Sequence, residues 1–261
     1  MAAALARGWA RASLRPASML FTDSGSGRAE SLAAEVGGHR LGSLEDLADR
    51  ADLVVLAVKP AALDDVAPKI AGRPGGVISV LGATPLATLA AALAPTPVLR
   101  TMPNLAVEVG RGVICHTPLA ADERSGVLGE ALALLGSLGS VFEVEEDELD
   151  PATAVMGCAP AYIALAVEAL IEAGVEAGLD PELSSRLVSE ATAGVGHHLL
   201  THEPRPMQEA IASPGGSTEA GLDELAERDV HAAFKAAVDA SVLPPGEAIA
   251  SRIGPGSWVS R

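Results

Sequence analysis

The segment DLVVLAVKP, residues 52–60, is the clearest indicator of the fold class. Its apolar residues run without a break between an aspartate and a Lys-Pro pair. A short apolar run that ends at turn-forming residues is typical of a strand buried in a parallel sheet. Helical patterns flank it on both sides, over residues 44–51 and 61–72. A buried strand between two helices predicts an α/β domain.

The alternation of strand and helix continues over residues 1–147. Further strands are predicted at 18–23, 75–82, 97–104, 112–118 and 141–144. Helical patterns separate most of them, at 27–37, 85–93 and 123–139. Parallel strands that alternate with helices form sheets covered on both faces. Residues 1–147 are therefore predicted to form a doubly wound α/β domain.

The sequence changes character from residue 148 onward, where apolar positions follow a helical period. A long helix is predicted over residues 151–178 and a second over 181–202, with a proline in its first turn. Shorter helices are predicted at 204–211, 217–227 and 230–241, and the Pro/Gly-rich stretch 243–261 is predicted to fray. Residues 148–261 are thus predicted to form an all-α domain.

Composition excludes several classes of partner. The formal charge of −16 argues against nucleic-acid or anionic-membrane binding, because both require a basic surface. Glutamates interrupt the longest apolar helix, so no membrane span is predicted. The two cysteines, Cys115 and Cys158, have no metal spacing and indicate a reduced, cytoplasmic protein. The six histidines do not suggest a metal site either, so no metal is expected.

The first 21 residues have two interpretations. They carry Arg7, Arg11 and Arg15 and no acid before Asp23, which is the pattern of a transit peptide. The same residues fit an ordinary helix with its arginines in water, followed by a strand. The sequence leaves both interpretations open.

The segment IASPGGSTEAGL, residues 211–222, joins two adjacent glycines to an expected helix. Pro214 ends the preceding element, Ser217 suits the N-cap, and Glu219 lies in the first turn. One interpretation is a tight turn with a helix cap. The other is a nest of bare backbone N–H groups that binds an anion.

Four segments together resemble a known family. They are LVVLAVKP (53–60), VLRTMPN (98–104), CAPAYIAL (158–165) and SPGGSTEAGL (213–222), in an order and at separations similar to those of the pyrroline-5-carboxylate reductases. The resemblance covers nearly the whole chain. It implies a Rossmann-type cofactor domain followed by a helical dimerisation domain, in homodimers that often assemble into rings. The implied reaction is hydride transfer from NADP(H) or NAD(H) to the C=N bond of a cyclic imino acid, giving proline.

The resemblance also implies which residues form the site. The substrate carboxylate and ring would be held by Ser213, Gly215, Gly216, Ser217 and Thr218. Thr218 would act catalytically, because its hydroxyl matches the family's threonine beside the imine nitrogen. The cofactor would contact residues at strand ends, namely Ala57, Val58, Lys59, Pro60 and Asn104. Asp23 and Ser24 end another strand, where an acid suits the ribose of NAD and nearby serines suit the phosphate of NADP.

The chain departs from the family pattern in four regions. Met1 to Leu5 match the residues just after the family's glycine-rich turn, so the first strand and that turn are absent from the sequence. Met156, Gly157, Cys158 and Ala159 replace a Ser-Gly-Ser-Gly segment. Ala83 stands where the family usually has glycine, and Leu105-Ala106 replaces a Thr-Pro pair.

These departures leave alternatives to proline synthesis. Either the true start lies upstream of Met1, or the chain is a degenerate, non-catalytic dimerising relative. A reductase of another cyclic imino acid is also compatible with the changes at 156–159. Without its first strand the isolated chain is expected to be marginally stable or prone to aggregate, since exposed strand edges recruit partners.

Overall fold

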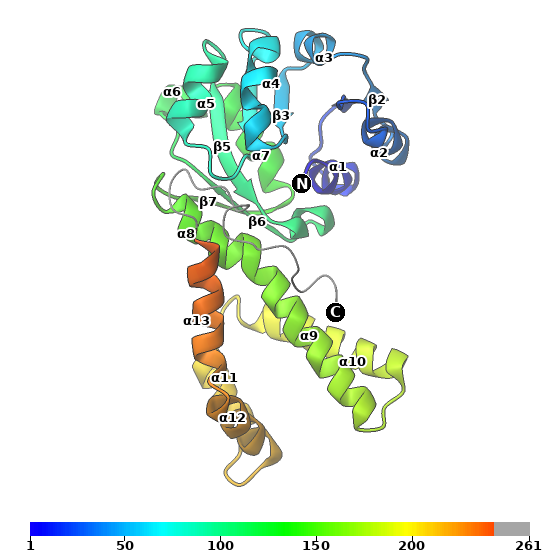
Figure 1. Ribbon diagram of the computed structural model, residues 1–261, viewed down its shortest axis with the longest axis vertical. Coiled ribbons are helices and arrows are strands. Elements are labelled where there is room, and N and C mark those ends of the chain that lie inside the picture. The colour runs from blue at the N-terminus through cyan, green and yellow to red at the C-terminus, as the bar shows by residue number, and fades with distance from the viewer. Residues whose placement is uncertain (243–261) are drawn as a thin grey trace. The chain divides into compact units, whose positions relative to one another are not determined.

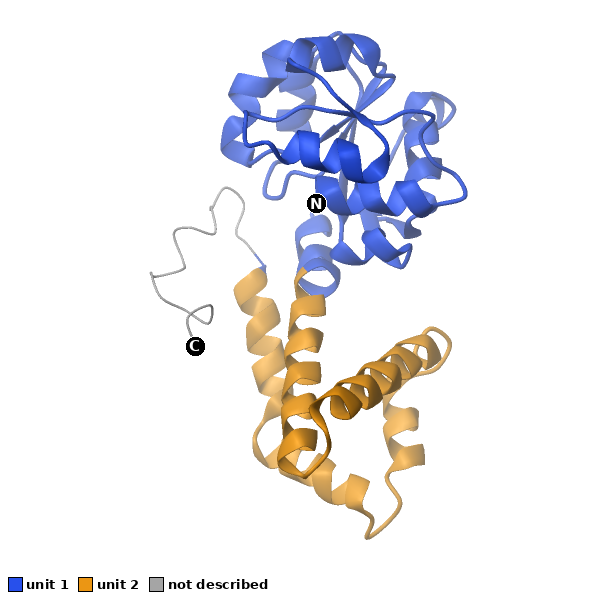
Figure 2. Ribbon diagram, turned by 90° about the vertical axis from the view of Figure 1, so that its right-hand side faces the viewer, with its two compact units in different colours: residues 1–157, 242–261 blue, residues 158–241 orange. Residues whose placement is uncertain are grey.

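A computed structural model describes residues 1–242 of the chain (Figure 1). The described chain divides into two compact units, residues 1–157 together with Val242, and residues 158–241 (Figure 2). The stretch 243–261, for which fraying was predicted, lies outside the described residues. The division falls later than the boundary predicted at residue 148, within a helix that runs from Leu149 to Glu176.

The first unit contains two β-sheets. Strands β1 (Leu20–Phe21) and β2 (His39–Arg40) form a parallel pair. The larger sheet has the order β3-β4-β5-β6-β7, formed by Leu53–Leu56, Gly76–Ser79, Val98–Pro103, Gly112–His116 and Gly139–Glu143. Strands β1 and β3 are not paired with each other, and each has one edge without a strand partner among the described residues. Within the described residues, the larger sheet therefore ends at β3.

The larger sheet is mixed, because one of its strand pairs is antiparallel. Strands β3, β4 and β5 are parallel, as are β6 and β7, but β5 and β6 are antiparallel. Only Asn104 to Arg111 connect β5 to β6, including the short 3-10 helix η2 (Leu105–Val109). A parallel connection needs a crossover of a dozen or more residues, so this short link reverses the chain.

Helices cover both faces of the larger sheet, as the α/β pattern predicted. The helices of the first unit include α1 (Ala2–Arg11), α2 (Arg28–Val36), α3 (Leu44–Arg50), η1 (Pro60–Ala62), α4 (Leu63–Ile70), α5 (Leu86–Leu93), α6 (Ala121–Arg124) and α7 (Val127–Gly136). Adjacent residues of β4 point to opposite sides. Val77 packs in a core with α3, α4 and α5, whereas Ile78 packs in a second core with α1 and α7. This alternation places the sheet between two helical layers.

The first helix is part of the second core, which matches the ordinary-helix interpretation of residues 2–11. Leu5 and Trp9 are buried there, and the Trp9 indole donates a hydrogen bond to the Leu134 carbonyl at 2.9 Å. Arg7 lies on the outer side and pairs with Glu35 at 2.7 Å. The arginines therefore do not prevent this helix from packing.

Ala83 adopts a left-handed backbone conformation in the turn after β4, with φ of +53°. This region costs a residue with a Cβ atom about 1–2 kcal/mol relative to glycine. We expect Ala83→Gly to raise the free energy of unfolding by about 1 kcal/mol, because the flexibility of glycine in the unfolded chain offsets part of the gain. Chemical denaturation measures the change. The control Ala91→Gly, at an exposed position of helix α5, should lower stability by about 1 kcal/mol. An Ala83→Gly variant no more stable than the wild type would contradict the assigned strain.

The second unit is all-helical, as predicted. The helix from Leu149 begins in the first unit with α8 (Leu149–Thr153) and the π-helical turn η3 (Ala154–Cys158), and continues in the second unit as α9 (Ala159–Glu176). It is followed by α10 (Pro181–His198), α11 (Pro204–Ile211), α12 (Ser217–Glu227) and α13 (Val230–Ser241). Helices α9 and α10 approach closely where the Ser184 hydroxyl donates to the Ile171 carbonyl at 2.8 Å. The Tyr162 hydroxyl joins α9 to α13 through the Ala237 carbonyl and the Ser241 hydroxyl.

This helical unit has almost no core of its own. Ser184 is the one buried residue among 158–241, while large apolar side chains on α9 and α10 are exposed, including Ile163, Leu165, Leu170, Leu183 and Leu187. By length and hydropathy alone, the helix from Leu149 to Glu176 is also long and apolar enough to cross a membrane. Such exposed apolar surface on a helical unit indicates that another surface covers it.

Candidate active site

The segment 57–60 leaves the end of β3 at the surface. Ala57 is half-buried, and Val58, Lys59 and Pro60 are exposed before the 3-10 turn η1 begins. Lys59 forms no ion pair within the part of the chain that the structure describes. Its ammonium group is therefore available to an anionic ligand. It lies at the carboxyl end of a parallel strand, where the dinucleotide is predicted to bind.

Asn104, at the end of β5, uses its side chain to brace the backbone. Only 6% of its surface is exposed. Its Oδ1 accepts a hydrogen bond from the Val113 amide at 3.1 Å, and its Nδ2 donates to the Met156 carbonyl at 2.9 Å. Asn104 therefore links β5 and β6 to the π-helical turn η3. One Nδ2 hydrogen remains for a ligand on its predicted nicotinamide side.

Asp23 organises the loop between β1 and α2. Its carboxylate accepts hydrogen bonds from the Ser26 hydroxyl at 2.6 Å, the Gly25 amide at 3.0 Å and the Ala29 amide at 3.2 Å. These donors, led by the Ser26 hydroxyl, lower the pKa of Asp23 to about 2. Arg28 donates to the Ser26 hydroxyl at 3.0 Å, while Ser24 is exposed. Both oxygens of the predicted ribose-binding acid thus face its own loop.

We expect carbon NMR of the Asp23 carboxyl group to give a titration midpoint near pH 2. Because this pKa is lower in the folded chain, the stability it contributes is complete above about pH 4 and is lost as the pH falls toward 2. Ser26→Ala removes the strongest donor and should raise the midpoint toward the usual 3.8. Ser24→Ala is the control and should leave it unchanged. A midpoint unaffected by Ser26→Ala would contradict the assigned cause.

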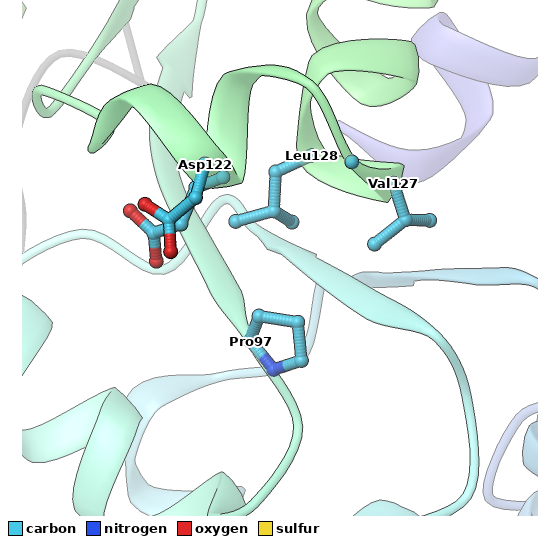
Figure 3. Close-up of a pocket in the computed structure, with 6 residues that line it drawn as sticks. Pro97, Asp122, Val127 and Leu128 are labelled. Atoms are coloured by element: carbon cyan, nitrogen blue, oxygen red, sulfur yellow. The ribbon is translucent and has the colours of Figure 1, made fainter.

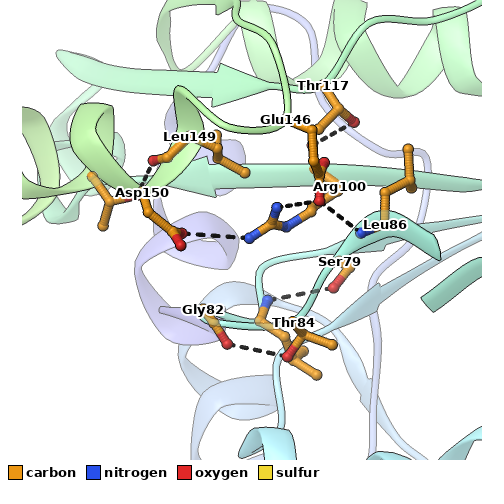
Figure 4. Close-up of polar contacts among 11 residues, drawn as sticks. Ser79, Gly82, Thr84, Leu86, Arg100, Thr117, Glu146, Leu149 and Asp150 are labelled. Carbon is orange, nitrogen blue, oxygen red and sulfur yellow. Dashed lines mark hydrogen bonds and ion pairs between the residues drawn. The ribbon is translucent and has the colours of Figure 1, made fainter. Parts of the chain in front are cut away.

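A buried arginine that was not among the predicted site residues anchors the start of α8 and the segment before it (Figure 4). Arg100, in β5, has a side chain 4% exposed and pairs with Glu146 at 2.6 Å and Asp150 at 3.5 Å. Glu146 also accepts from the Leu86 amide at the start of α5, at 2.9 Å. The Arg100 Nε has no hydrogen-bond partner among the described residues. An arginine inside an apolar strand run was the available signal, because a buried charge requires partners.

The segment 213–219 forms the turn into α12. Gly215 has a φ of +73°, and Gly216 is the N-cap, so the prediction of Ser217 as the cap was wrong by one residue. The left-handed turn at Gly215 brings the next residue into the extended conformation that a cap needs. Ser217 is therefore the first helical residue. Ser213, Gly215 and Ser217 are exposed, whereas Gly216 and Thr218 are half-buried.

Hydrogen bonds divide the amides of this segment into two groups. The Gly216 amide donates to the Ser213 carbonyl at 2.9 Å, and the Gly215 amide donates to the Glu219 carboxylate at 2.7 Å. The amides of Ser217, Thr218 and Glu219 have no acceptor among the described residues, because they form the first turn of α12. The hydroxyls of Ser217 and Thr218 also have no partner there. Three amides and two hydroxyls are thus open at a helix N-terminus, which favours an anion.

Two pockets, one in each unit, do not include these residues. A pocket of about 170 Å³ in the first unit is lined by Pro97, Asp122, Glu123, Gly126, Val127 and Leu128 (Figure 3). Pro97 precedes β5, so this pocket lies at the end of the strand opposite Asn104. A pocket of about 620 Å³ in the second unit is lined by Glu203, Pro204, Arg205, Gln208 and His231. None of the predicted site residues lines either pocket.

Two sequence families match successive parts of the chain. A family described as NADP oxidoreductase, coenzyme F420-dependent, matches residues 1–82. A family described as pyrroline-5-carboxylate reductase dimerisation matches residues 146–244, which include the 213–219 segment. The order of the two matches agrees with an α/β unit followed by a helical unit.

Curated relatives and solved structures agree with these matches. The pyrroline-5-carboxylate reductase of Thermus thermophilus is 36% identical over 73% of this chain and 73% of its own length. That of Corynebacterium melassecola is 32% identical over 91% of each chain. The crystal structure of the Streptococcus pyogenes enzyme superposes with a TM-score of 0.82 at 30% identity, covering 93% of each chain. The Plasmodium falciparum pyrroline carboxylate reductase, solved with NADP bound, has a TM-score of 0.77 at 27% identity over 92% of this chain and 90% of its own. The chain therefore belongs to the pyrroline-5-carboxylate reductase family.

Proposed function

We propose that the chain reduces 1-pyrroline-5-carboxylate to proline with NAD(P)H, the last step of proline synthesis. A hydride adds to the carbon of the C=N bond, and a proton adds to the nitrogen. The observation that supports this most directly is the set of open amides at the start of α12, within the residues that match the reductase dimerisation family. They supply donors for a small carboxylate in a chain whose formal charge is −16.

In this proposal the residues 213–219 form a carboxylate cradle. The amides of Ser217 and Thr218 bind the substrate carboxylate, and Ser213, Gly215 and Gly216 shape the turn around the ring. The Thr218 hydroxyl donates a hydrogen bond to the imine nitrogen, or relays the proton that this nitrogen gains. The hydride comes from the nicotinamide, so the chain contributes position and polarity.

The proposed cofactor contacts lie at the strand ends of the first unit. Lys59 pairs with a phosphate of the dinucleotide, and the backbone at Ala57, Val58 and Pro60 lies along it. Asn104 offers its remaining Nδ2 hydrogen on the nicotinamide side. The loop at Asp23 and Ser24 receives the adenosine ribose. Because the Asp23 carboxylate is held by its own loop, this site accepts both NADPH and NADH.

We further propose that the chain acts as a cytoplasmic homodimer, which can assemble into larger rings. The match to a dimerisation family and the exposed apolar side chains of α9 and α10 support a second copy as their cover. The acidic surface supports neither nucleic acid nor an anionic membrane as a partner.

A coupled assay tests the proposed reaction. We expect the 261-residue chain to oxidise NADPH or NADH when 1-pyrroline-5-carboxylate is added, and to do so more slowly with the six-membered analogue. The unpaired edges of β1 and β3 favour the alternative of a non-catalytic dimerising relative. Calorimetric titration with NADPH separates the two, because a non-catalytic relative without a pyrophosphate site would not bind it. Proline formation together with tight NADPH binding supports the reductase. If the chain forms no proline and does not bind NADPH, the proposal is overturned.

A further inference from the structure

Glu219 places a carboxylate of the chain itself on the carboxylate cradle. Its Oε2 accepts the Gly215 amide at 2.7 Å, the short distance typical of a charge-assisted hydrogen bond. Gly215 and Glu219 are both exposed, so the contact is open to solvent and can break. Three further amides at the start of α12 remain open beside it. The Glu219 carboxylate is the same chemical group as the carboxylate of the proposed substrate.

Among residues 1–242, no basic side chain forms an ion pair with this carboxylate. The ion pairs described in the second unit are Arg205 with Glu209, Arg228 with Glu224, and Lys235 with Asp239, and none includes Glu219. A second carboxylate that reaches the same helix end therefore meets an uncompensated negative charge. The two carboxylates repel each other when both lie at this helix end, and they compete for the same few amide donors.

We propose that Glu219 competes with the substrate carboxylate for the cradle and so sets the apparent affinity for the imino acid. This proposal rests on the proposed function. The substrate displaces the Glu219 carboxylate, and the Gly215 amide then becomes a further donor to the substrate. Glu219 touches neither the imine nor the hydride, so it raises KM and leaves kcat unchanged. The penalty applies only to ligands that carry a carboxylate.

The contact also has a purely structural interpretation. A glutamate at the third helical position that accepts a backbone amide near the cap resembles a capping box. In that case its removal lowers the stability of α12 and leaves ligand affinity unchanged. Glutamine distinguishes the two roles, because it keeps the acceptor oxygen of the capping bond and removes the charge.

The experiment compares Glu219→Gln with Glu227→Gln in the full chain. Glu227 is exposed in the last turn of the same helix, so its variant makes the same change in charge away from the cradle. Steady-state kinetics give KM and kcat for 1-pyrroline-5-carboxylate. Calorimetry gives the affinities for proline and for pyrrolidine, which lacks the carboxylate, in the presence of NADP⁺.

We expect Glu219→Gln to lower KM and the dissociation constant of proline about three- to fivefold, the size typical of an exposed charge interaction. Its kcat and its affinity for pyrrolidine should match those of the wild type, as should every constant of Glu227→Gln. A Glu219→Gln variant with unchanged or weaker proline binding would overturn the competition. Circular dichroism verifies that both variants fold. If the wild type neither turns over the imino acid nor binds proline, both the proposed function and the competition are overturned. If the wild type is active and both variants have the same KM and proline affinity as the wild type, only the competition is overturned.

Discussion

Thr218→Ala should lower kcat about 100-fold while the affinities for proline and NADPH change little. Thr218 is half-buried in the first turn of α12, and its hydroxyl has no partner among the described residues. In the proposed mechanism this hydroxyl donates to the nitrogen that gains a proton, an interaction that strengthens toward the transition state. Positioned proton donors contribute about 10²–10⁴ in rate, and 100-fold corresponds to about 2.7 kcal/mol.

Two control variants make this result specific. Thr218→Ser keeps the hydroxyl and should retain kcat within about fivefold. Ser217→Ala removes the neighbouring hydroxyl but leaves the amides of the cradle in place, so its kcat should remain near that of the wild type. Single-turnover measurement of NADPH oxidation separates the chemical step from product release. A Thr218→Ala enzyme with half of the wild-type rate would remove Thr218 from the mechanism.

The double substitution Leu170→Asp/Leu187→Asp should convert the proposed dimer into monomers. Leu170 in α9 is 58% exposed and Leu187 in α10 is 52% exposed, although both are large and apolar. Burying a leucine contributes about 1.5–3 kcal/mol, and a two-fold dimer buries each position twice. Loss of this burial, together with the cost of burying aspartates, should raise the dimer dissociation constant by more than about 10³-fold.

Sedimentation equilibrium measures that dissociation constant directly. Leu14→Asp makes the same chemical change at a position 49% exposed in the first unit, and it should leave the dimer unchanged. The double variant should also unfold at a lower temperature, because its helical unit has almost no core of its own. A double variant that dimerises as tightly as the wild type would show that α9 and α10 are covered by something other than a second copy.

The sequence predicts the element types well because their signals are local. The apolar run at 53–56 and the helical periods of α9 and α10 each lie within one segment, and all three elements form where predicted. The direction of β6 relative to β5 could not be predicted from its apolar run, because such runs do not record strand direction. Only the short link from Asn104 to Arg111 determines it.

The site depends more strongly on contacts between distant residues. Arg100 meets Glu146, which is 46 residues away, so neither local pattern nor spacing could have paired them. Asn104 was selected for its strand end, but its hydrogen bond to Met156 across 52 residues is visible only in the fold. Helix α12 covers the predicted residues 217–227, but its N-cap is Gly216 and not Ser217, because the left-handed turn at Gly215 determines which residue becomes the cap.

A crystal structure of the chain with proline and NADP⁺ tests the central claim most directly. We expect the proline carboxylate to lie within about 3 Å of the Ser217 and Thr218 amide nitrogens, with the ring nitrogen beside the Thr218 hydroxyl. Its δ-carbon, which is the carbon of the C=N bond in 1-pyrroline-5-carboxylate, should face the nicotinamide. A carboxylate bound to other groups, with these amides still facing solvent, would contradict the proposed site.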